Sequence, residues 1–175
     1  MTTHYSTLDT PVGPFTIVAA ADGAVLASGF TADVPALLAL VHLSLHETGL
    51  AGPQHRADLG PATKAVLGYL DGDLATLDAV PVRQHNGGAF LGHAWDVLRT
   101  VPAGAPVSYT QFAALAGRPA AVRGAAQACA RNAAALFVPC HRVLRGDSTL
   151  GGYRWGTPVK RWLLDHEARM VHQSG

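Results

Sequence analysis

Residues 139–143, with the sequence PCHRV, place the thiol of Cys140 next to the imidazole of His141, and Cys140 is one of only 2 cysteines in the chain. A cysteine reacts as its thiolate, and with an ordinary pKa of ~8.5 it is mostly protonated at neutral pH. It therefore needs a base and a positive environment. A small-residue stretch ends at Asn132 upstream, and Glu167 lies in a C-terminal helical segment downstream. A thiol beside a base, with an acid elsewhere in the chain, predicts one reactive site built around a nucleophilic thiol.

The composition limits the class of protein. A chain of 175 residues, 49% of them hydrophobic, suggests one domain or two small domains that share an interface. No apolar run approaches the ~18–20 residues of a membrane span, and the N-terminus lacks the pattern of a secretory signal. Two cysteines do not make a disulfide framework. We therefore expect a reducing, cytoplasmic compartment in which Cys140 stays a free thiol.

Charge is distributed unevenly along the chain. The net charge is only +1, which argues against DNA binding by bulk charge. Of the 13 lysines and arginines, however, all but Arg56 and Lys64 lie within residues 83–169. This asymmetry is typical of a DNA-binding half joined to a supporting half. The 9 histidines are scattered, and although His42 and His46 have helical spacing, no further ligands lie nearby, so no metal site is predicted.

The elements expected in the first half describe a small α/β unit. Turn signals at residues 9–11 and at Asp22-Gly23 separate three expected strands. Asp33 is a candidate N-cap for a helix. The expected strands cover residues 4–9, 15–20, 24–30 and 78–82, the expected helices residues 33–47 and 61–71, and the expected loop residues 49–60.

The second half is expected to be mostly helical. Ser108 is a candidate N-cap for a helix that stops at Gly117, and a second, alanine-rich helix follows, as in a helix-turn-helix. The expected helices cover residues 89–101, 109–116 and 120–131 and a last segment opened by Pro158, with a short buried strand at residues 136–138. The predicted domains are residues 1–82 and 89–175, joined by a linker at residues 83–88.

Several motifs, in order and at family spacing, resemble the active-site domain of the O6-alkylguanine-DNA alkyltransferases. They are Val107-Ser108-Tyr109, Ala128-Cys129-Ala130-Arg131-Asn132, Val138-Pro139-Cys140-His141-Arg142-Val143, Arg145-Gly146-Asp147, Gly152-Tyr153-Arg154-Trp155-Gly156, Lys160 and Leu163-Leu164-Asp165-His166-Glu167. The resemblance implies a ribonuclease-H-like α/β N-terminal unit followed by a mostly α, winged helix-turn-helix-like active-site domain. It also implies irreversible transfer of an alkyl group from O6-alkylguanine, and from O4-alkylthymine, to Cys140.

The resemblance assigns roles around the thiol. Cys140, a water, His141 and Glu167 would form a proton relay with triad logic. Tyr109 would assist base flipping and donate a hydrogen bond toward the guanine, which gathers negative charge as it leaves. Asn132 would tie the recognition helix to the active-site turn.

The resemblance also implies a DNA interface and a base pocket. A base inside a duplex must be flipped out, and Arg123 matches the family's intercalating arginine. The helix that carries Arg123 would enter the minor groove of double-stranded DNA as part of a monomer. Expected phosphate contacts are Thr110, Arg118 and Gly146, and expected pocket residues are Val143, Gly152, Tyr153, Arg154, Trp155 and Lys160. No cofactor and no zinc are expected.

Some residues are assigned other roles or depart from the family pattern. Arg142 is expected to make a buried ion pair with the N-terminal half, and Cys129 to pack among alanines. Residues 91–93 are Leu-Gly-His, where the family usually has glutamine-rich polar residues, and this weakens any DNA contact from that helix.

Two other classes of protein remain open from the residues alone. A Cys-His hydrolase would leave Tyr109, Arg123 and Asn132 unexplained. A winged-helix or non-catalytic module that binds alkylated DNA would explain the arginines but leave Cys140, His141 and Glu167 without a role. A Cys140→Ser substitution separates these hypotheses, because a binding module keeps its function and a transferase loses it.

Overall fold

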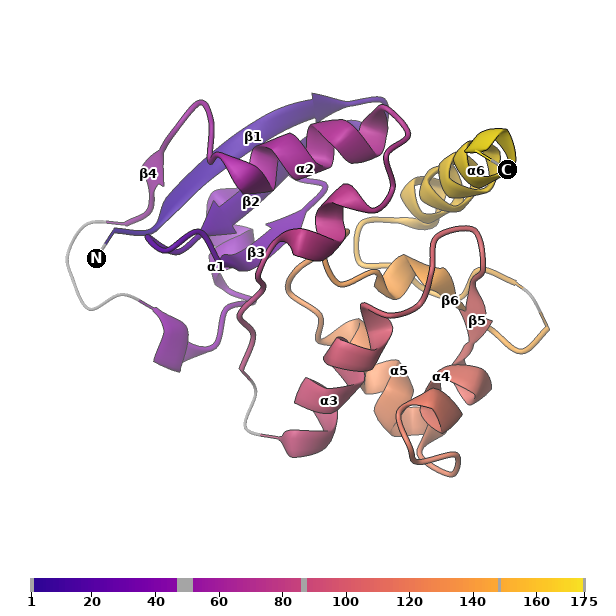
Figure 1. The fold of residues 1–175 in the computed structure, drawn as a ribbon. Helices are drawn as coiled ribbons and strands as arrows, with labels where there is room; N and C mark the ends of the chain where they lie inside the picture. Colours follow the sequence, from indigo (N-terminus) through magenta and orange to yellow (C-terminus); the bar gives the residue numbers. More distant parts are fainter. Residues whose placement is uncertain (1, 47–51, 86–87, 148, 175) are drawn as a thin grey trace. The chain divides into compact units, whose positions relative to one another are not determined.

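The computed structural model describes residues 2–46, 52–85, 88–147 and 149–174 (Figure 1). The chain divides into two compact units. Unit 1 comprises Met1–His85 and Ala133–Phe137, and unit 2 comprises Asn86–Asn132 and Val138–Gly175. The chain therefore passes through unit 1 a second time, between Asn132 and Val138. Of the expected linker at residues 83–88, residues 86–87 lie outside the described part.

Unit 1 is built on a mixed four-stranded sheet of order β3-β2-β1-β4. Strands β1, β2 and β3 are antiparallel neighbours, and β4 runs parallel to β1. All five residues of β3 are buried, and so are the last five of β2, so both faces of these two neighbouring strands are covered. The strands are β1 His4–Thr10, β2 Gly13–Ala19, β3 Val25–Gly29 and β4 Gln54–His55, so the first three expected strands are confirmed.

Two helices and two 3₁₀ turns complete unit 1. The helices are α1 Val34–Leu38 and α2 Pro61–Leu70, and the 3₁₀ turns are Leu43–Leu45 and Thr76–Ala79. Helix α2 packs against β1 (Figure 1). Asp33 caps α1 as expected, since its carboxylate accepts from the amide of Ala36 at 3.1 Å.

Two expectations for unit 1 are wrong in extent or type. The helix expected over residues 33–47 ends at Leu38, and of its apolar side chains only Leu37 and Val41 are buried among the described residues, too few to hold further turns. The strand expected at residues 78–82 is a 3₁₀ turn followed by a single bridge from Val82 to Val25. Pro81 has no N–H group, so a longer ladder is not favoured there.

Unit 2 is mostly helical. Its elements are α3 Ala89–Leu98, β5 Val107–Ser108, α4 Tyr109–Leu115, α5 Val122–Ala130, a 3₁₀ turn at Cys140–Arg142, β6 Val143–Leu144 and α6 Thr157–Ser174. Helix α5 packs against both α3 and α4 (Figure 1). The indole of Trp95 donates to the Ala128 carbonyl at 2.8 Å and joins α3 to α5. The expected helix pair is therefore present.

The strand expected at residues 136–138 is absent, although these residues are buried. Leu136 has a φ of 71°, which is incompatible with an extended strand. Ala134, two residues earlier in the chain, contacts the sheet instead, through an isolated parallel bridge to Ser28 of β3. Among the described residues, no helix has both the length and the apolar character needed to cross a membrane.

Candidate active site

Cys140 begins a tight 3₁₀ turn that the flanking backbone fixes. Its amide donates to the Val138 carbonyl at 2.8 Å, and the Arg142 amide donates to the Pro139 carbonyl at 3.0 Å. The turn leads into β6, which pairs in parallel with β5 so that Val107 faces Val143. This pairing places the thiol turn close to the start of α4, where Tyr109 follows β5 directly.

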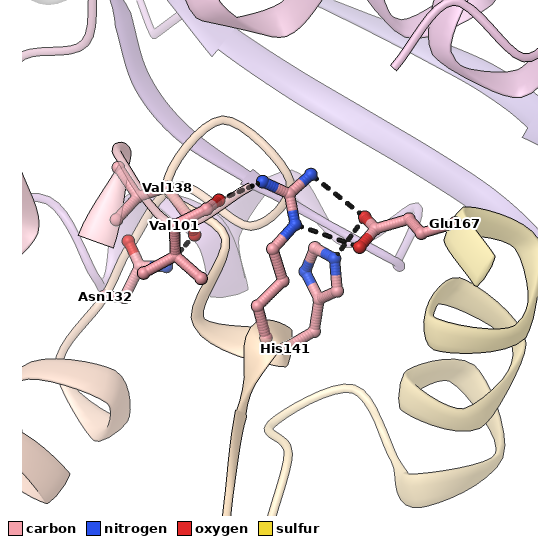
Figure 2. A network of polar contacts seen from close by, with 6 residues as sticks. Val101, Asn132, Val138, His141 and Glu167 are labelled. Carbon is pink, nitrogen blue, oxygen red and sulfur yellow. Dashed lines mark hydrogen bonds and ion pairs between the residues drawn. The ribbon is translucent and has the colours of Figure 1, made fainter. Parts of the chain in front are cut away.

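Glu167 of α6 holds the two residues that follow the thiol (Figure 2). The Nε2 of His141 lies 2.6 Å from one carboxylate oxygen, and the Nε of Arg142 donates to the other oxygen at 2.9 Å. Arg142 also donates through Nη2 to Glu167 at 3.1 Å and through Nη1 to the Val101 carbonyl at 2.7 Å. Arg142 therefore pairs within unit 2, and the expectation of an ion pair with the N-terminal half is wrong.

The carboxylate of Glu167 is fully buried yet ionised. Burial alone would raise its pKa, but the charges and hydrogen bonds of His141 and Arg142 outweigh burial and lower the pKa to about 2. A buried carboxylate that keeps its charge holds the imidazole in one orientation. With Nε2 bonded to the carboxylate, Nδ1 is the ring nitrogen left to exchange a proton with another group, and Nδ1 is buried without a hydrogen-bond partner among the described residues.

The ionisation of Cys140 reflects opposing effects. Burial raises the pKa of its thiol, whereas a hydrogen bond from the Asn132 side chain and the charges of Lys160 and Arg154 oppose that rise. Asn132 also donates to the Val138 carbonyl at 2.8 Å, two residues before Cys140 (Figure 2). The side-chain amide of Asn132 therefore contacts both the backbone before Cys140 and the thiol itself.

Lys160 is a fully buried cation in the first turns of α6. Its Nζ donates to the Val143 carbonyl at 2.8 Å and to the Gly152 carbonyl at 3.3 Å. Burial lowers the pKa of Lys160, and the negative charge that Cys140 acquires as a thiolate opposes this. The ammonium therefore joins two expected pocket segments and also favours the thiolate.

Two tyrosines lie near the thiol. Burial, followed by the charges of Cys129 and Cys140, raises the pKa of Tyr109 to about 12, so this phenol remains a hydrogen-bond donor at neutral pH. Its ring packs against Gly151, where an added Cβ would lie 3.5 Å from the hydroxyl. Burial first, then Cys140 and Glu167, raises the pKa of Tyr153, whose hydroxyl is buried without a hydrogen-bond partner among the described residues.

The remaining expected site residues are placed as follows. Arg123 and Thr110 are exposed on α5 and α4, Arg118 is exposed in the turn between them, and Gly146 is exposed after β6. Arg154 donates to the Ala130 carbonyl, and Trp155 is half-buried in the loop before α6. Cys129 is partly buried, and burial raises the pKa of its thiol, in keeping with the packing role expected for it.

Sequence reasoning missed two contributors to the site. Arg145 carries a charge that lowers the pKa of Tyr109 against the other effects there, yet in the sequence it stood out only as part of a motif. The Val101 carbonyl accepts a hydrogen bond from Arg142, and no sequence pattern predicts which backbone carbonyl will act as such an acceptor. His42 and His46, which have helical spacing in the sequence, make local contacts with Ser44 and with the Val41 carbonyl, each at 2.9 Å.

Residues 89–169 match the protein family described as 6-O-methylguanine DNA methyltransferase, DNA binding domain. The matched range includes every residue expected to act in catalysis, in DNA contact or in the pocket. Residues 89–169 therefore belong to the O6-methylguanine-DNA methyltransferase family. This confirms the resemblance noted in the sequence.

Curated relatives in this family match part of their length. The Escherichia coli (strain K12) bifunctional transcriptional activator/DNA repair enzyme Ada is 55% identical over 82 residues, which are 47% of this chain and 23% of that protein. The Shigella flexneri methylated-DNA--protein-cysteine methyltransferase is 38% identical over 103 residues, 59% of this chain and 60% of that protein. The chain therefore spans about a quarter of the first relative and three fifths of the second.

Solved structures of methyltransferases match over nearly the whole chain. The Mycobacterium tuberculosis O6-methylguanine methyltransferase has a TM-score of 0.76 at 27% identity, covering 96% of this chain and 94% of that chain. A structure of the OGT of the same organism in complex with DNA has the same TM-score of 0.76, also at 27% identity, over 95% and 94% of the two chains. The predicted order, an α/β unit followed by a mostly helical DNA-binding domain, is confirmed, and the sheet of the first unit is mixed.

Proposed function

We propose that this protein repairs DNA by transferring the alkyl group of O6-alkylguanine, and of O4-alkylthymine, to its own Cys140. The observation that carries the proposal is the arrangement around the thiol. Cys140 is the first residue of a 3₁₀ turn, and the Nε2 of His141 beside it lies 2.6 Å from the buried carboxylate of Glu167. The side chain of Asn132 donates a hydrogen bond to the sulfur of Cys140. Family membership supplies the substrate class.

The proton of the thiol would leave through His141. Burial raises the pKa of Cys140, so a base must take the proton at neutral pH. The Nδ1 of His141 is the acceptor that remains once Nε2 donates to Glu167. Because Nδ1 has no partner among the described residues, a water between it and the sulfur would complete the relay. Glu167, already ionised, would stabilise the imidazolium that forms.

The transfer itself is a displacement at the alkyl carbon. The sulfur of Cys140 forms a bond to that carbon as the bond to O6 breaks, and guanine leaves with the electron pair. Tyr109 keeps its proton because its pKa is raised to about 12, so it can donate to the leaving base. The product is a thioether, which no thiol reductant reverses, so each molecule would act once and without a cofactor.

Access to the base would depend on α5. The lesion must leave the base stack, at a cost of a few kcal/mol. Helix α5 presents the exposed Arg123 beside small residues such as Gly124 and Ala126, which suits close approach to the minor groove and weak sequence readout. A relative solved with DNA supports a DNA partner. We propose that a monomer binds double-stranded DNA in this way.

Intact mass spectrometry tests the proposal directly. The protein is incubated with a duplex carrying one O6-methylguanine, beside a Cys140→Ser control. We expect the wild type alone to gain one methyl group, with stoichiometric loss of the lesion. Tight binding of the lesion without any gain of mass would contradict transfer and support the alternative, a non-catalytic sensor of alkylated DNA.

A further inference from the structure

The ring of Phe90 contacts two parts of the helix-turn-helix. The guanidinium of Arg118, in the turn between α4 and α5, lies over this ring at 5.0 Å from its centroid. A Cβ added at Gly124 of α5 would lie 2.8 Å from Cε1 of the same ring. Real Cβ atoms essentially never come so close, so the Phe90 ring occupies space that is open only because residue 124 is a glycine.

This stacking leaves the hydrogen bonds of Arg118 available. A planar guanidinium packs on an aromatic ring through its face, whereas its N–H donors point outward in its plane. The side chain is exposed, and within the described residues no hydrogen bond or ion pair of its guanidinium occurs. An arginine held in this way loses less conformational freedom when it binds a planar anion such as a phosphate.

We propose that Phe90 is a positioning residue for DNA binding, which packs against Gly124 and holds the Arg118 guanidinium ready for a backbone phosphate. The proposal rests on the proposed function only in taking DNA as the ligand. It gives α3 a role in DNA binding through an internal contact, although residues 91–93 of this helix lack the polar side chains usual in the family.

A double-mutant cycle tests the proposal with an undamaged duplex. Dissociation constants are measured over a range of salt concentrations for the wild type, Phe90→Leu, Arg118→Gln and the double variant. We expect Phe90→Leu to weaken binding about two- to fivefold, the usual strength of an exposed cation–π contact. Arg118→Gln should weaken binding and reduce the salt slope by about 1. The double variant should bind no more weakly than Arg118→Gln alone.

Two glycine substitutions distinguish the contact between Phe90 and Gly124 from the general effect of replacing a glycine in a helix. Gly124→Ala should displace the Phe90 ring and weaken binding as Phe90→Leu does, but add nothing in the Arg118→Gln background. Gly92→Ala is the matched control, because Gly92 lies in α3 and, beyond its chain neighbours and its own helix backbone, no described atom lies within 4 Å of an added Cβ. It should leave the affinity for DNA unchanged. Thermal unfolding of each variant verifies that the fold is retained.

Three results would overturn the proposal. The first is that Phe90→Leu binds DNA as tightly as the wild type. The second is that Phe90→Leu weakens binding equally whether residue 118 is arginine or glutamine. The third is that Arg118→Gln leaves the salt dependence of the dissociation constant unchanged. Because the duplex is undamaged, the measurement does not depend on alkyl transfer. A wild type that binds DNA in this way but gains no methyl group from a lesion would contradict the proposed function and leave the positioning role standing.

Discussion

At the scale of single residues, one carboxylate organises the site. Glu167 accepts hydrogen bonds from His141 and from two nitrogens of Arg142, and all three side chains are buried. Breaking a buried ion pair by removing one partner typically costs about 3–5 kcal/mol, because an uncompensated charge remains. The same group that orients the proposed base therefore also fastens the thiol turn to α6.

Glu167→Gln should destabilise the protein in a pH-dependent way. The folded pKa of about 2 lies below the ordinary 4.5, so the stabilisation is fully present above pH ~4.5 and is lost as the pH falls through about 2. A shift of this size corresponds to about 3 kcal/mol. Urea unfolding should therefore show a large difference between wild type and variant at pH 7 and a much smaller one at pH 3.

Asp165→Asn is the matched control for this prediction. It makes the same change from carboxylate to amide two residues away in α6, at an exposed position, and should change the free energy of unfolding little at either pH. A loss of stability in Glu167→Gln that is equal at pH 7 and pH 3 would contradict the assignment of an ionised, depressed carboxylate.

The sequence could indicate the candidate nucleophile more readily than its partners. Cys140 and His141 are adjacent, so a local motif reveals them, and the resemblance added Glu167. The partner of Arg142 was mispredicted, because a buried arginine can pair with any acid that the fold brings near. Spacing along the chain does not encode that choice, which is settled by where α6 packs.

At the scale of elements, the start of α4 is defined by a capping box. The Ser108 hydroxyl accepts from the Gln111 amide at 3.0 Å, and the Gln111 side chain accepts from the Ser108 amide at 2.8 Å. Tyr109 is the first residue of this helix. The cap therefore fixes the backbone from which the proposed donor to the leaving base projects.

Ser108→Ala should destabilise the protein by about 1 kcal/mol, the usual cost of losing an N-cap, and lower its melting temperature by about 2–4 °C. Fraying at Tyr109 should also slow alkyl transfer. A double-mutant cycle with Gln111→Ala, followed by thermal unfolding, checks the pairing. Fully additive losses would contradict a reciprocal box, because two residues that share a contact should couple.

Elements with local causes were the predictable ones. The cap at Asp33, the turn at Asp22-Gly23 and the stop at Gly117 depend on residues within a few positions, and the structure has each of them. The expected strand at residues 136–138 failed for a different reason. Its apolar residues are buried as a strand would be, but Leu136 turns the backbone to a φ of 71°, and hydrophobicity alone does not distinguish a buried turn from a buried strand.

At the scale of the whole molecule, a five-residue segment of unit 1 interrupts the chain of unit 2. Residues 133–137 belong to unit 1, whereas Asn132 before them and Val138 after them belong to unit 2. Ser28 of β3 fixes this segment, since its amide donates to the Ala133 carbonyl and its hydroxyl to the Ala135 carbonyl, both at 2.8 Å. The sheet thereby constrains the five residues that separate Asn132 from Val138.

We therefore expect Ser28→Ala to slow alkyl transfer as well as to reduce stability. Losing the buried bond to Ala135 should lower the free energy of unfolding by about 1–2 kcal/mol. Ser6→Ala is the matched control, because Ser6 is a buried serine of the same sheet whose hydroxyl donates to the Ala57 carbonyl at 3.3 Å, far from this segment in the chain.

Single-turnover rates of methyl transfer and urea unfolding are measured for both variants. Both should lose stability, but only Ser28→Ala should transfer the methyl group more slowly than the wild type at a temperature where all three proteins are folded. Equal rates for the two variants would mean that unit 1 contributes only stability. A slower Ser28→Ala would mean that the sheet sets the geometry of the loop between Asn132 and Cys140, so that the N-terminal unit takes part in positioning the thiol.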